Sequence, residues 1–569
     1  MTQRRIVSAL ENSIRSHPQN DALVTGDEVI TYRQFGEYVD EFVAKLQAST
    51  RRGEFVGIEA TRTPSSIVAM VGAMIAECPF VFIDPRDSTS SNAGKVSSLD
   101  IEVVARTADG SPVPVLATAS TLPWGTAADQ DPAIGVPTGG DRIGYAIHTS
   151  GSTGEPKCVL VRVDPLARVI EDHVRQLEVT PESRTLQFAR LTFDGCITEI
   201  LWTLTAGACL VILPEERLRP GAMLGATLEN YRVTHLKTTP FALTATDPTS
   251  AMSLRHVVNG GGACRPALMR KWSEVAAFHN AYGLTETTIC NLLSDPLTPD
   301  ECADGVPLGK LVGEGDYHLE SLPLSTEDGT RRGPRGELVI TGGCVAFGYL
   351  TPTGVRRFLD ANGVQIYRTG DVVEMRGGEL YFVERVDRQV KVRGYRIDPG
   401  EIESAACRLD GVVEAVVTAE SHDGSDQAAA DALVCYYLGA ATPREVRGHL
   451  EVVLDGYKVP SVIQQIDTLP YTRNGKVDRD ALRASRQATR SEQATVPAAE
   501  QVLQLARHLT GVADAGLNDN FFDIGGDSAS TLILVNRLKE LGWMDVGVRD
   551  VLRAENLESL VLELSERSV

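Results

Sequence analysis

Residues Tyr145–Cys158 read YAIHTSGSTGEPKC, an apolar strand that runs into a loop rich in glycine, serine and threonine. The glycines let backbone N–H groups close around an anion, the hydroxyls add donors, and Lys157 adds positive charge. The loop therefore predicts a phosphate cradle, although taken alone it fits a plain turn equally well. It is not a Walker A loop, because no glycine directly precedes Lys157 and the G-x-x-x-x-G-K-[ST] spacing is not met.

The composition of the whole chain limits the classes of protein to which it can belong. The chain has 569 residues, of which 43% are hydrophobic, so about three or four compact units with sizeable cores are expected. The net charge of −21 disfavours nucleic acid and anionic membranes as partners. Neither a signal peptide nor a run of about 18 apolar residues is present. The ten cysteines form no C-x-x-C pair, which disfavours disulfides and zinc and predicts a reducing, cytoplasmic location.

The residue pattern changes three times along the chain. Residues 1–386 alternate β-branched runs with amphipathic stretches, which is typical of α/β layering. Residues 387–485 read as a smaller α+β unit, with strands at VVEAVVTAE and ADALVCYYLG and a helix after Pro443. Residues 486–498 are polar and small, as in a linker. Residues 499–569 carry apolar positions at helical spacing, which predicts a small helical bundle.

Six motifs in order resemble the motif series of the adenylate-forming superfamily, and they span nearly the whole chain. They are TSGSTGEPK at 149–157, NAYGLTETT at 280–288, GELVITGGCVAFGYL at 336–350, YRTGD at 367–371, RVDRQVKVRGYRID at 385–398 and PYTRNGKVDR at 470–479. The resemblance implies a large α/β N-terminal subdomain and a small α+β C-terminal subdomain, followed here by an all-α four-helix carrier bundle.

The resemblance also implies a set of residues for ATP and Mg²⁺. Tyr282 stacks on adenine, Asn280 hydrogen-bonds it, and Asp371 accepts from the ribose with Arg385 nearby. Glu286 holds Mg²⁺, and Lys476 stabilises charge at the α-phosphate. Without the motif series, Asp371 is better explained as a turn residue and Lys476 as a solvated lysine. The remaining residues of this set are Thr149, Ser150, Gly151, Ser152, Thr153, Gly154, Lys157 and Thr285.

Two further positions match residues that take part in the conformational change of the family, and a third matches the attachment residue of a carrier domain. Asp387 corresponds to the hinge about which the smaller subdomain turns after adenylation, and the loop around Gly394 then enters the site. DNFFDIGGDSAS, at 519–530, resembles the core of a peptidyl carrier, in which Ser528 bears 4′-phosphopantetheine. A serine in this place is otherwise a good helix N-cap.

RLTFDGCITEI, at 190–200, resembles the motif that carries the amino-acid pocket. Asp194 matches the residue that pairs with the substrate ammonium; its alternative is an exposed aspartate at a helix start. Lys237 predicts an acidic or amide side chain in the substrate, and its alternative is a lysine whose head reaches water. The pattern is similar to that of aspartate-activating domains. The other pocket positions are Gly195, Thr198, Val258, Gly260, Ala281, Ile289 and Cys290, with Lys476 closing the set.

Several positions depart from the family pattern. Gly195, Ala281 and Cys290 differ from the aspartate pattern, which leaves room for a β-substituted aspartate. Cys158 and Glu384 stand where glycine is usual, and Phe347 stands where arginine is usual; these three positions have no catalytic role.

The sequence therefore predicts a nonribosomal peptide synthetase adenylation–carrier didomain. It activates an amino acid, with aspartate or a β-substituted aspartate as the first choice and asparagine as the alternative, and loads it on Ser528. A phosphopantetheinyl transferase and an acceptor enzyme acting in trans are the expected partners, because no H-H-x-x-x-D or G-x-S-x-G motif is present. The sequence does not decide whether an MbtH-like protein is needed. The remoter alternatives are an acyl-CoA ligase and a noncatalytic carrier scaffold.

Overall fold

The computed structural model describes most of the chain, and the structural statements below concern the described part. By number, the described residues are 5–26, 28–108, 110–124, 142–149, 157–250, 253–303, 305–321, 333–386, 389–420, 430, 432–470, 477–479, 481–486, 498–510, 512, 515–526, 530–531, 534–535, 537–538, 543 and 546–567.

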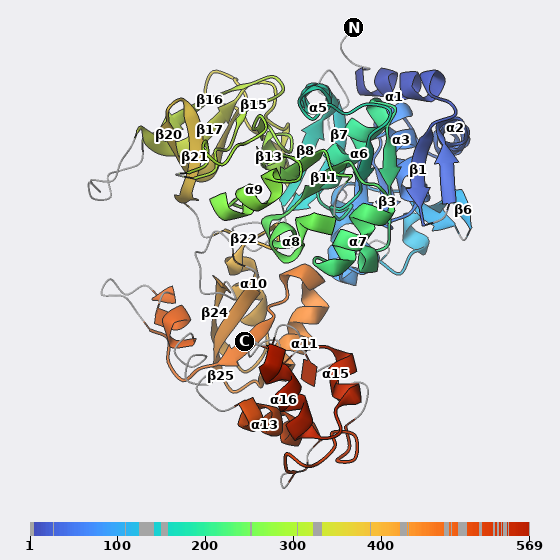
Figure 1. The fold of residues 1–569 in the computed structure, drawn as a ribbon. Helices are drawn as coiled ribbons and strands as arrows, with labels where there is room; N and C mark the ends of the chain where they lie inside the picture. Colours follow the sequence, from blue (N-terminus) through green and yellow to red (C-terminus); the bar gives the residue numbers. More distant parts are fainter. Residues whose placement is uncertain are drawn as a thin grey trace. The chain divides into compact units, whose positions relative to one another are not determined.

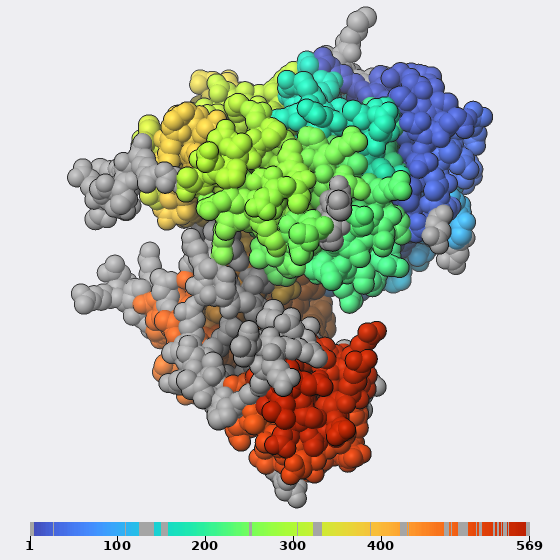
Figure 2. All heavy atoms as spheres, viewed as in Figure 1, coloured from blue at the N-terminus to red at the C-terminus, as the bar shows by residue number. Residues whose placement is uncertain are grey.

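The chain divides into two compact units, Met1–Asp467 and Thr468–Val569, which are described separately. Figure 1 shows the fold of each unit, and Figure 2 shows that side chains fill the spaces between the ribbons on this face of the first unit. The boundaries predicted at residues 386, 485 and 498 remain predictions.

A mostly parallel sheet holds the residues that matter most for the site. In the described part of the chain it has nine strands in the order β15-β14-β13-β12-β11-β9-β10-β1-β2. Its middle strands are buried along their full length, as expected when helices cover both faces. The strands are β1 Asp21–Thr25, β2 Glu28–Thr31, β9 Arg184–Leu186, β10 Cys209–Val211, β11 His235–Thr238, β12 His256–Asn259, β13 Ala277–Tyr282, β14 Leu292–Leu293 and β15 Lys310–Leu311.

A second sheet carries the two ends of the glycine-rich loop. Its eight described strands run in the order β19-β18-β8-β7-β4-β3-β5-β6. Strands β7 and β8 pair antiparallel, with Thr149 opposite Lys157, so the loop connects two neighbouring strands. The strands are β3 Val56–Glu59, β4 Phe80–Ile83, β5 Val103–Ala108, β6 Ser111–Thr118, β7 Ile143–Thr149, β8 Lys157–Arg162, β18 Gly348–Thr351 and β19 Gly354–Arg357.

Helices pack against these two sheets around a large apolar core. Helix α2 begins with a capping box, in which Thr31 and Gln34 satisfy each other's backbone N–H groups. The helices are α1 Arg5–Ser16, α2 Tyr32–Ser49, α3 Pro64–Ile75, α4 Thr89–Ser98, α5 Val163–Gln176, α6 Gly195–Thr205, α7 Ala222–Asn230, α8 Pro240–Ala245 and α9 Pro266–Ser273, with short turns η1 Ala119–Thr121, η2 Glu215–Leu218, η3 Pro248–Ser250 and η4 Thr285–Thr287.

An antiparallel sheet and a smaller α+β part complete the first unit. The sheet has the order β16-β17-β20-β21, with bounds Asp316–Glu320, Arg335–Thr341, Ile366–Arg376 and Glu379–Arg385. Both predicted strands and the helix predicted after Pro443 are confirmed as β24, β25 and α11. The smaller part contains β22 Val390–Val392, β23 Tyr395–Ile397, α10 Pro399–Ala406, β24 Val412–Glu420, β25 Ala432–Gly439, α11 Pro443–Val453, η6 Gly456–Lys458 and β26 Val462–Gln465.

The second unit is helical where it is described, as the C-terminal sequence predicts. Apolar residues of these helices, such as Val502, Leu560 and Leu564, are buried together with Phe521. The helices are α13 Ala498–Thr510, α15 Val548–Arg553 and α16 Leu557–Arg567.

Within the described residues, none of the helices is long and apolar enough to span a bilayer. All ten cysteines are described, and each is a free thiol.

Candidate functional site

Four of the predicted pocket positions lie in or just after the carboxyl ends of three adjacent parallel strands, namely Lys237, Val258, Gly260 and Ala281. Lys237 is in β11 and pairs in register with Val258 in β12, while Ala281 lies near the end of β13. This edge of a parallel sheet is where α/β proteins place their ligand sites. Helix α6 faces the same edge, because the Lys237 Nζ lies 2.5 Å from Thr198 Oγ1 and 3.4 Å from the Gly195 carbonyl oxygen.

The surroundings of Lys237 define what we call the Lys237 cluster: Lys237, Gly195, Thr198 and Gly260. A β-carbon added to Gly195 would lie 3.8 Å from Lys237 Nζ, and one added to Gly260 would lie 3.6 Å from Lys237 Cε. Two small residues thus make room for the lysine side chain.

The Lys237 ammonium is buried, since only 6% of the residue is exposed. The alternative of a lysine with its head in water is therefore wrong. Burial by itself lowers the pKa of Lys237, but neighbouring Cys290 and Glu199 outweigh burial and the pKa is raised. Lys237 is thus a buried charged group that hydrogen-bonds the Thr198 hydroxyl, the Gly195 carbonyl and the Cys290 side chain. A buried ammonium favours an anionic or carbonyl partner from a ligand.

Asp194 lies at the start of α6 with one carboxylate oxygen unused. Its Oδ2 is buried and has no hydrogen-bond partner among the described residues, and its side chain does not cap the helix. Burial raises the pKa of Asp194, although the Thr285 hydroxyl and the Lys237 ammonium favour the ionised form. A buried acceptor without a donor is costly, so this oxygen fits a cationic ligand group.

Tyr282, Asp371 and Arg385 come together although they are up to 103 residues apart in the sequence numbering. The Tyr282 hydroxyl donates to Asp371 Oδ2 at 2.5 Å, and Arg385 pairs with Asp371 Oδ1. Asp371 is 1% exposed, so the alternative of an ordinary turn residue at the surface does not describe it. The Asn280 side chain already bonds Asn259 and the Pro307 carbonyl, both at 2.8 Å.

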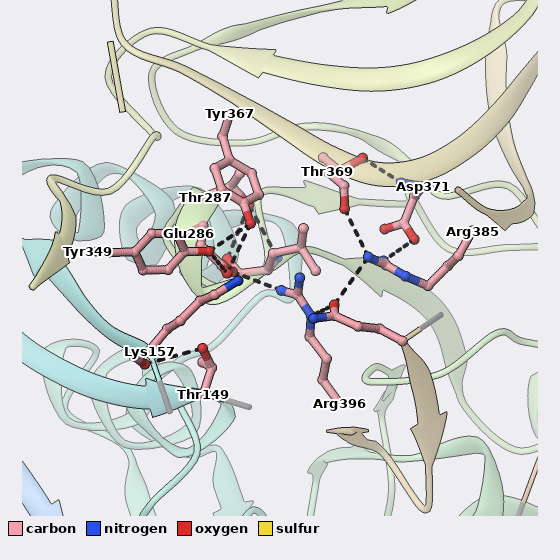
Figure 3. Close-up of polar contacts among 12 residues, drawn as sticks. Thr149, Lys157, Glu286, Thr287, Tyr349, Tyr367, Thr369, Asp371, Arg385 and Arg396 are labelled. Carbon is pink, nitrogen blue, oxygen red and sulfur yellow. Dashed lines mark hydrogen bonds and ion pairs between the residues drawn. The ribbon is translucent and has the colours of Figure 1, made fainter. Parts of the chain in front are cut away.

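Glu286, the predicted Mg²⁺ ligand, is the centre of a buried polar cluster (Figure 3). Its carboxylate accepts from the hydroxyls of Tyr349 at 2.6 Å and Tyr367 at 3.0 Å, and Arg396 NH1 lies 2.9 Å from Oε2. Burial opposes ionisation, but Arg396 and Tyr349 outweigh it and the pKa of Glu286 is lowered. Glu286 is therefore ionised, and a guanidinium supplies its counter-charge in this arrangement.

Lys157 and Thr149 border this cluster from the second sheet. The Thr149 hydroxyl donates to the Lys157 carbonyl at 3.4 Å, and the Lys157 side chain extends toward Glu286 (Figure 3). Burial lowers the pKa of Lys157, and the charge of Glu286 partly offsets the effect. The Lys157 end of the predicted phosphate cradle thus lies beside the predicted metal ligand.

A tight loop joins Tyr282, a predicted nucleotide-binding residue, to the predicted pocket positions Ile289 and Cys290. A β-carbon on Gly283 would lie 1.6 Å from the Ile289 carbonyl oxygen, so only glycine fits where the two ends of the loop touch. Thr288 and Ile289 have φ of 62° and 71°, a left-handed conformation that is strained for β-branched residues. The Thr288 hydroxyl holds the loop by donating to the Cys344 carbonyl at 2.6 Å.

The smaller α+β part contacts the same edge of the sheet. Gly394 lies against Gly261 and Thr239. A β-carbon added to Gly261 would lie 3.2 Å from the Gly394 carbonyl oxygen, and one added to Gly394 would clash with the Thr239 side chain. Tyr395 and Tyr457 pack on Phe193, with ring centroids 4.6 and 5.2 Å away. The residue next to Asp194 is thus covered by two tyrosines from the smaller part.

Some predicted site residues fall outside the described residues. They are Ser150, Gly151, Ser152, Thr153 and Gly154 of the cradle, the hinge Asp387, Lys476, and the attachment residue Ser528. In the turn that precedes Ser528, Gly525 has a φ of 99°, and a β-carbon added to Gly526 would clash with Phe521. The backbone therefore requires glycine at both positions.

Sequence reasoning missed Arg396, Tyr349, Tyr367, Tyr395 and Tyr457 as neighbours of the site. All except Tyr457 lie in or beside the quoted motifs, so the signal was present, but no pattern states which distant partner each side chain meets. Phe347, which departs from the family pattern, is buried beneath the guanidinium of Arg357, 4.4 Å from the ring centroid.

Comparisons with known proteins agree with this geometry. Residues 10–350 match the family model for AMP-binding enzymes, residues 401–476 match the model of their C-terminal domain, and residues 500–564 match the phosphopantetheine attachment site. The chain belongs to the AMP-binding enzymes. It combines an adenylate-forming ligase domain, which uses ATP and Mg²⁺, with a carrier domain whose 4′-phosphopantetheine is covalently attached.

Relatives of this AMP-binding enzyme include large synthetases. It is 30% identical to bacitracin synthase 3 of Bacillus licheniformis, over 100% of this chain and 9% of that protein. It is 31% identical to novobiocin biosynthesis protein H of Streptomyces niveus, over 94% of this chain and 91% of that protein. The chain thus spans less than a tenth of the first relative and most of the second.

The fold is similar to solved adenylation–carrier structures. Holo-PA1221, an NRPS protein containing adenylation and PCP domains, has a TM-score of 0.72 at 23% identity and covers 99% of this chain and 96% of its own. The adenylation domain AlmE of Vibrio cholerae has a TM-score of 0.72 at 21% identity and covers 85% of this chain. The predicted fold class is therefore confirmed.

The AMP-binding enzyme also has a surface hollow of about 570 Å³ away from these residues. It contains none of the predicted site residues and is lined by Val24, Gly26, Arg184, Arg217, Asn230, Tyr231 and Arg232.

Asp371 is predicted to bind the ribose of ATP through charge-assisted hydrogen bonds. Replacing it by alanine is therefore expected to raise the KM for ATP by about 10–100-fold. Pyrophosphate exchange at varied ATP measures this change. Asp371→Asn keeps the shape and one acceptor and serves as the control, with a smaller rise. An ATP KM unchanged in Asp371→Ala would show that this carboxylate does not contact the nucleotide.

Proposed function

We propose that this chain activates an amino acid as its aminoacyl adenylate and loads it as a thioester on a phosphopantetheine arm borne by Ser528. The observation that carries the proposal is the buried, unpartnered Oδ2 of Asp194. It supplies a site for an α-ammonium group in a chain that has both an adenylate-forming domain and a carrier domain. Fatty and aryl acids have no ammonium group to place there, which disfavours an acyl-CoA ligase.

In the first half-reaction, a substrate carboxylate oxygen attacks the α-phosphorus of ATP and pyrophosphate leaves. Asp371 and Tyr282 bind the nucleoside, and Lys157 with the 150–154 loop binds the phosphates. Lys476 stabilises the charge that gathers at the α-phosphoryl group. Asp194 fixes the ammonium so that the carboxylate points to the phosphorus.

Glu286 fits the role of Mg²⁺ ligand, because it is a buried carboxylate with a lowered pKa and magnesium prefers hard oxygen ligands. When bound, the metal neutralises charge on the phosphates. Arg396 NH1 lies 2.9 Å from the same carboxylate, and Glu286 would hold the metal through this carboxylate.

In the second half-reaction, the thiol of the arm attacks the acyl carbon and AMP leaves. Support comes from Gly394, whose contact with Gly261 and Thr239 brings the predicted thiolation loop to the sheet edge. Tyr395 and Tyr457 hold this arrangement by packing on Phe193. Asp387 is the proposed hinge for the change between the two half-reactions.

The substrate that fits these charges best is L-aspartate or a β-substituted aspartate. Asp194 binds the ammonium and Lys237 binds the distal carboxylate, so both ends of a short dicarboxylic amino acid are fixed. Glu199 stays close to Lys237, but burial raises its pKa to about 7 and its oxygens already accept from the backbone N–H groups of Phe188 and Ala189. It is therefore a weak competitor for the ammonium.

The deciding experiment is ATP–pyrophosphate exchange with a panel of amino acids. Highest exchange with aspartate or a β-substituted aspartate supports the proposal, and asparagine in first place shifts it to the amide. Exchange only with acids that lack an amino group would identify an acyl ligase, and no exchange at all would identify a noncatalytic carrier scaffold.

Lys237→Met is expected to reduce exchange with aspartate by about 10–100-fold, since one charge-assisted bond is lost, and to affect apolar amino acids much less. The panel measures the change. Lys310→Met is the matched control, because Lys310 is an exposed lysine paired with Asp295 and its loss should leave the ranking unchanged. A wild-type enzyme that favours an aliphatic or aromatic amino acid would contradict the role of Lys237.

The proposed partners follow from the carrier. A phosphopantetheinyl transferase attaches the arm, and a separate condensation or tailoring enzyme accepts the acyl group. An MbtH-like protein is a further candidate, and co-purification with a tagged chain tests for it.

A further inference from the structure

Arg190 lies four residues before Asp194 and carries a largely buried guanidinium group. Its side chain is 18% exposed, and its Nη2 lies 2.7 Å from Asp84 Oδ2 and 3.8 Å from Asp87 Oδ1. Asp84 comes directly after β4 and is 2% exposed. It also accepts hydrogen bonds from the backbone and the side chain of Arg86, so Arg190 is tied to a carboxylate that is itself held in place.

Asp84 is a firm anchor because it stays ionised. Burial raises the pKa of Asp84, but the hydrogen bonds from Arg86 and Arg190 outweigh burial and lower this pKa to about 2. Breaking such a pair is costly, since it leaves a buried charge without its partner. The guanidinium of Arg190 therefore stays with the larger part of the first unit, by which we mean the described residues up to Val386.

Arg190 also meets two tyrosines of the smaller α+β part. Its Cζ lies 5.6 Å from the ring centroid of Tyr457, a distance at which a cation is attracted to an aromatic ring. Its side chain hydrogen-bonds the side chain of Tyr395, and Tyr395 directly follows Gly394 in the sequence. Arg190 thus connects Asp84 of the larger part to the predicted thiolation loop of the smaller part.

The two tyrosines are fixed to each other and to the smaller part. Their ring centroids are 5.0 Å apart, and Tyr457 belongs to the turn η6. The next residue, Lys458, is 4% exposed, and its Nζ lies 2.7 Å from Glu401 Oε1 in α10 and 3.6 Å from Asp455 Oδ2. Because this buried ion pair ties the turn to α10, both tyrosines are expected to move together with the smaller part.

The contacts of Arg190 with the tyrosines belong to one arrangement of the two parts. The arginine is in the larger part and both tyrosines are in the smaller part, so turning the smaller part about the proposed hinge separates them. In this structure they accompany the contact of Gly394 with the edge of the sheet. An interaction made in one of two states favours that state alone. These contacts therefore favour the arrangement proposed for thioester formation over the one in which Lys476 acts.

We propose that Arg190 is a positioning residue for thioester formation, which holds the Gly394 loop at the site through Tyr395 and Tyr457. The proposal rests on the proposed loading of a phosphopantetheine arm, in which the thiol sulfur bonds the acyl carbon, AMP leaves and the thiol proton goes to solvent. Arg190 acts through the tyrosines. Its loss is therefore expected to slow the attack of the thiol and to leave adenylation as it is.

The test compares Arg190→Met with wild type, both as the full chain with its arm attached. Methionine keeps much of the apolar stem and removes the guanidinium, while Arg86 still pairs with Asp84. Loading from chemically prepared aminoacyl adenylate, made with the amino acid that ranks first in the panel, is expected to be about 10-fold slower. ATP–pyrophosphate exchange, including the KM values for ATP and the amino acid, should stay within about two-fold of wild type.

Tyr457→Leu removes the ring from the other side of the contact and should show the same difference between the two assays. The double variant should slow loading by less than the product of the two single effects, because both substitutions break one shared contact. Single effects that multiply in the double variant would show that Arg190 and Tyr457 act independently, and the proposal would be wrong.

Arg184→Met is the matched control. The Arg184 side chain is 25% exposed, and its partners, Asp21 and the Tyr231 carbonyl, both lie in the larger part. Its loss should leave loading and exchange at their wild-type rates.

Two results overturn the proposal. One is loading by Arg190→Met at the wild-type rate, and the other is an equal fall in loading and exchange, which would indicate general damage to the segment that bears Asp194. If Arg190→Met does not fold, Tyr457→Leu is judged by the same two outcomes.

This proposal and the proposed function fail in different ways. A wild-type chain that exchanges pyrophosphate but gains no aminoacyl mass refutes carrier loading, and the role of Arg190 falls with it. A wild-type chain that loads normally, with Arg190→Met loading equally fast, refutes the role of Arg190 alone.

Discussion

A Ser528→Ala variant is expected to exchange pyrophosphate at the wild-type rate and to gain no covalent amino acid. The serine hydroxyl is the proposed attachment point for the arm, and without the arm there is no thiol to receive the acyl group. A thiol is a far better nucleophile at neutral pH than a hydroxyl. Intact-protein mass, measured after treatment with a phosphopantetheinyl transferase, ATP and the amino acid, reports the loss.

Ser530→Ala is the matched control, since it removes another hydroxyl two residues away and should load normally. Two results would contradict the assignment: aminoacyl mass on Ser528→Ala, or exchange that is lost together with loading. The second would mean that the substitution disturbs more than the carrier.

A Lys476→Ala variant is expected to lose about 10²–10³-fold in exchange rate, the scale on which one positioned charge stabilises a transition state. The transition state gathers negative charge at the α-phosphoryl group, and a solvated lysine elsewhere does not replace the missing ammonium. The KM for the amino acid should change much less than kcat, because the interaction is made in the transition state.

Arg473→Ala, three residues before Lys476 in the sequence, is the control for general loss of positive charge and should retain most of the exchange. Lys476→Ala should still load the carrier from chemically prepared aminoacyl adenylate, because the second half-reaction does not need this lysine. Exchange within a few-fold of wild type would assign the lysine to the solvated surface instead.

The sequence predicted most of the fold because the ordered motifs act as markers along it. The strand before the glycine-rich loop, the helix after Pro443 and the helical C-terminal unit all appear where local patterns place them. The convergence of Asp194, Thr198 and Lys237 was also predicted, through positions counted from the motifs.

Contacts between distant segments were not predictable in the same way. Arg396 meets Glu286 across 110 positions of sequence, and Tyr457 meets Phe193 from a helical turn with no motif of its own. Local patterns encode elements, while these pairings depend on how the elements are folded together.

The close contact between Gly283 and Ile289 has a practical consequence for redesign. Because the loop is closed on itself, the residues predicted to bind the adenine and those predicted to border the amino-acid side chain belong to one closely packed piece of backbone. Because Gly283 meets backbone atoms of Ile289 and Cys290, a substitution that moves the backbone at either residue is expected to shift Tyr282 as well. Transplanting the whole segment from Asn280 to Cys290 from a donor enzyme preserves its internal geometry, and is the better route to altered selectivity than single substitutions.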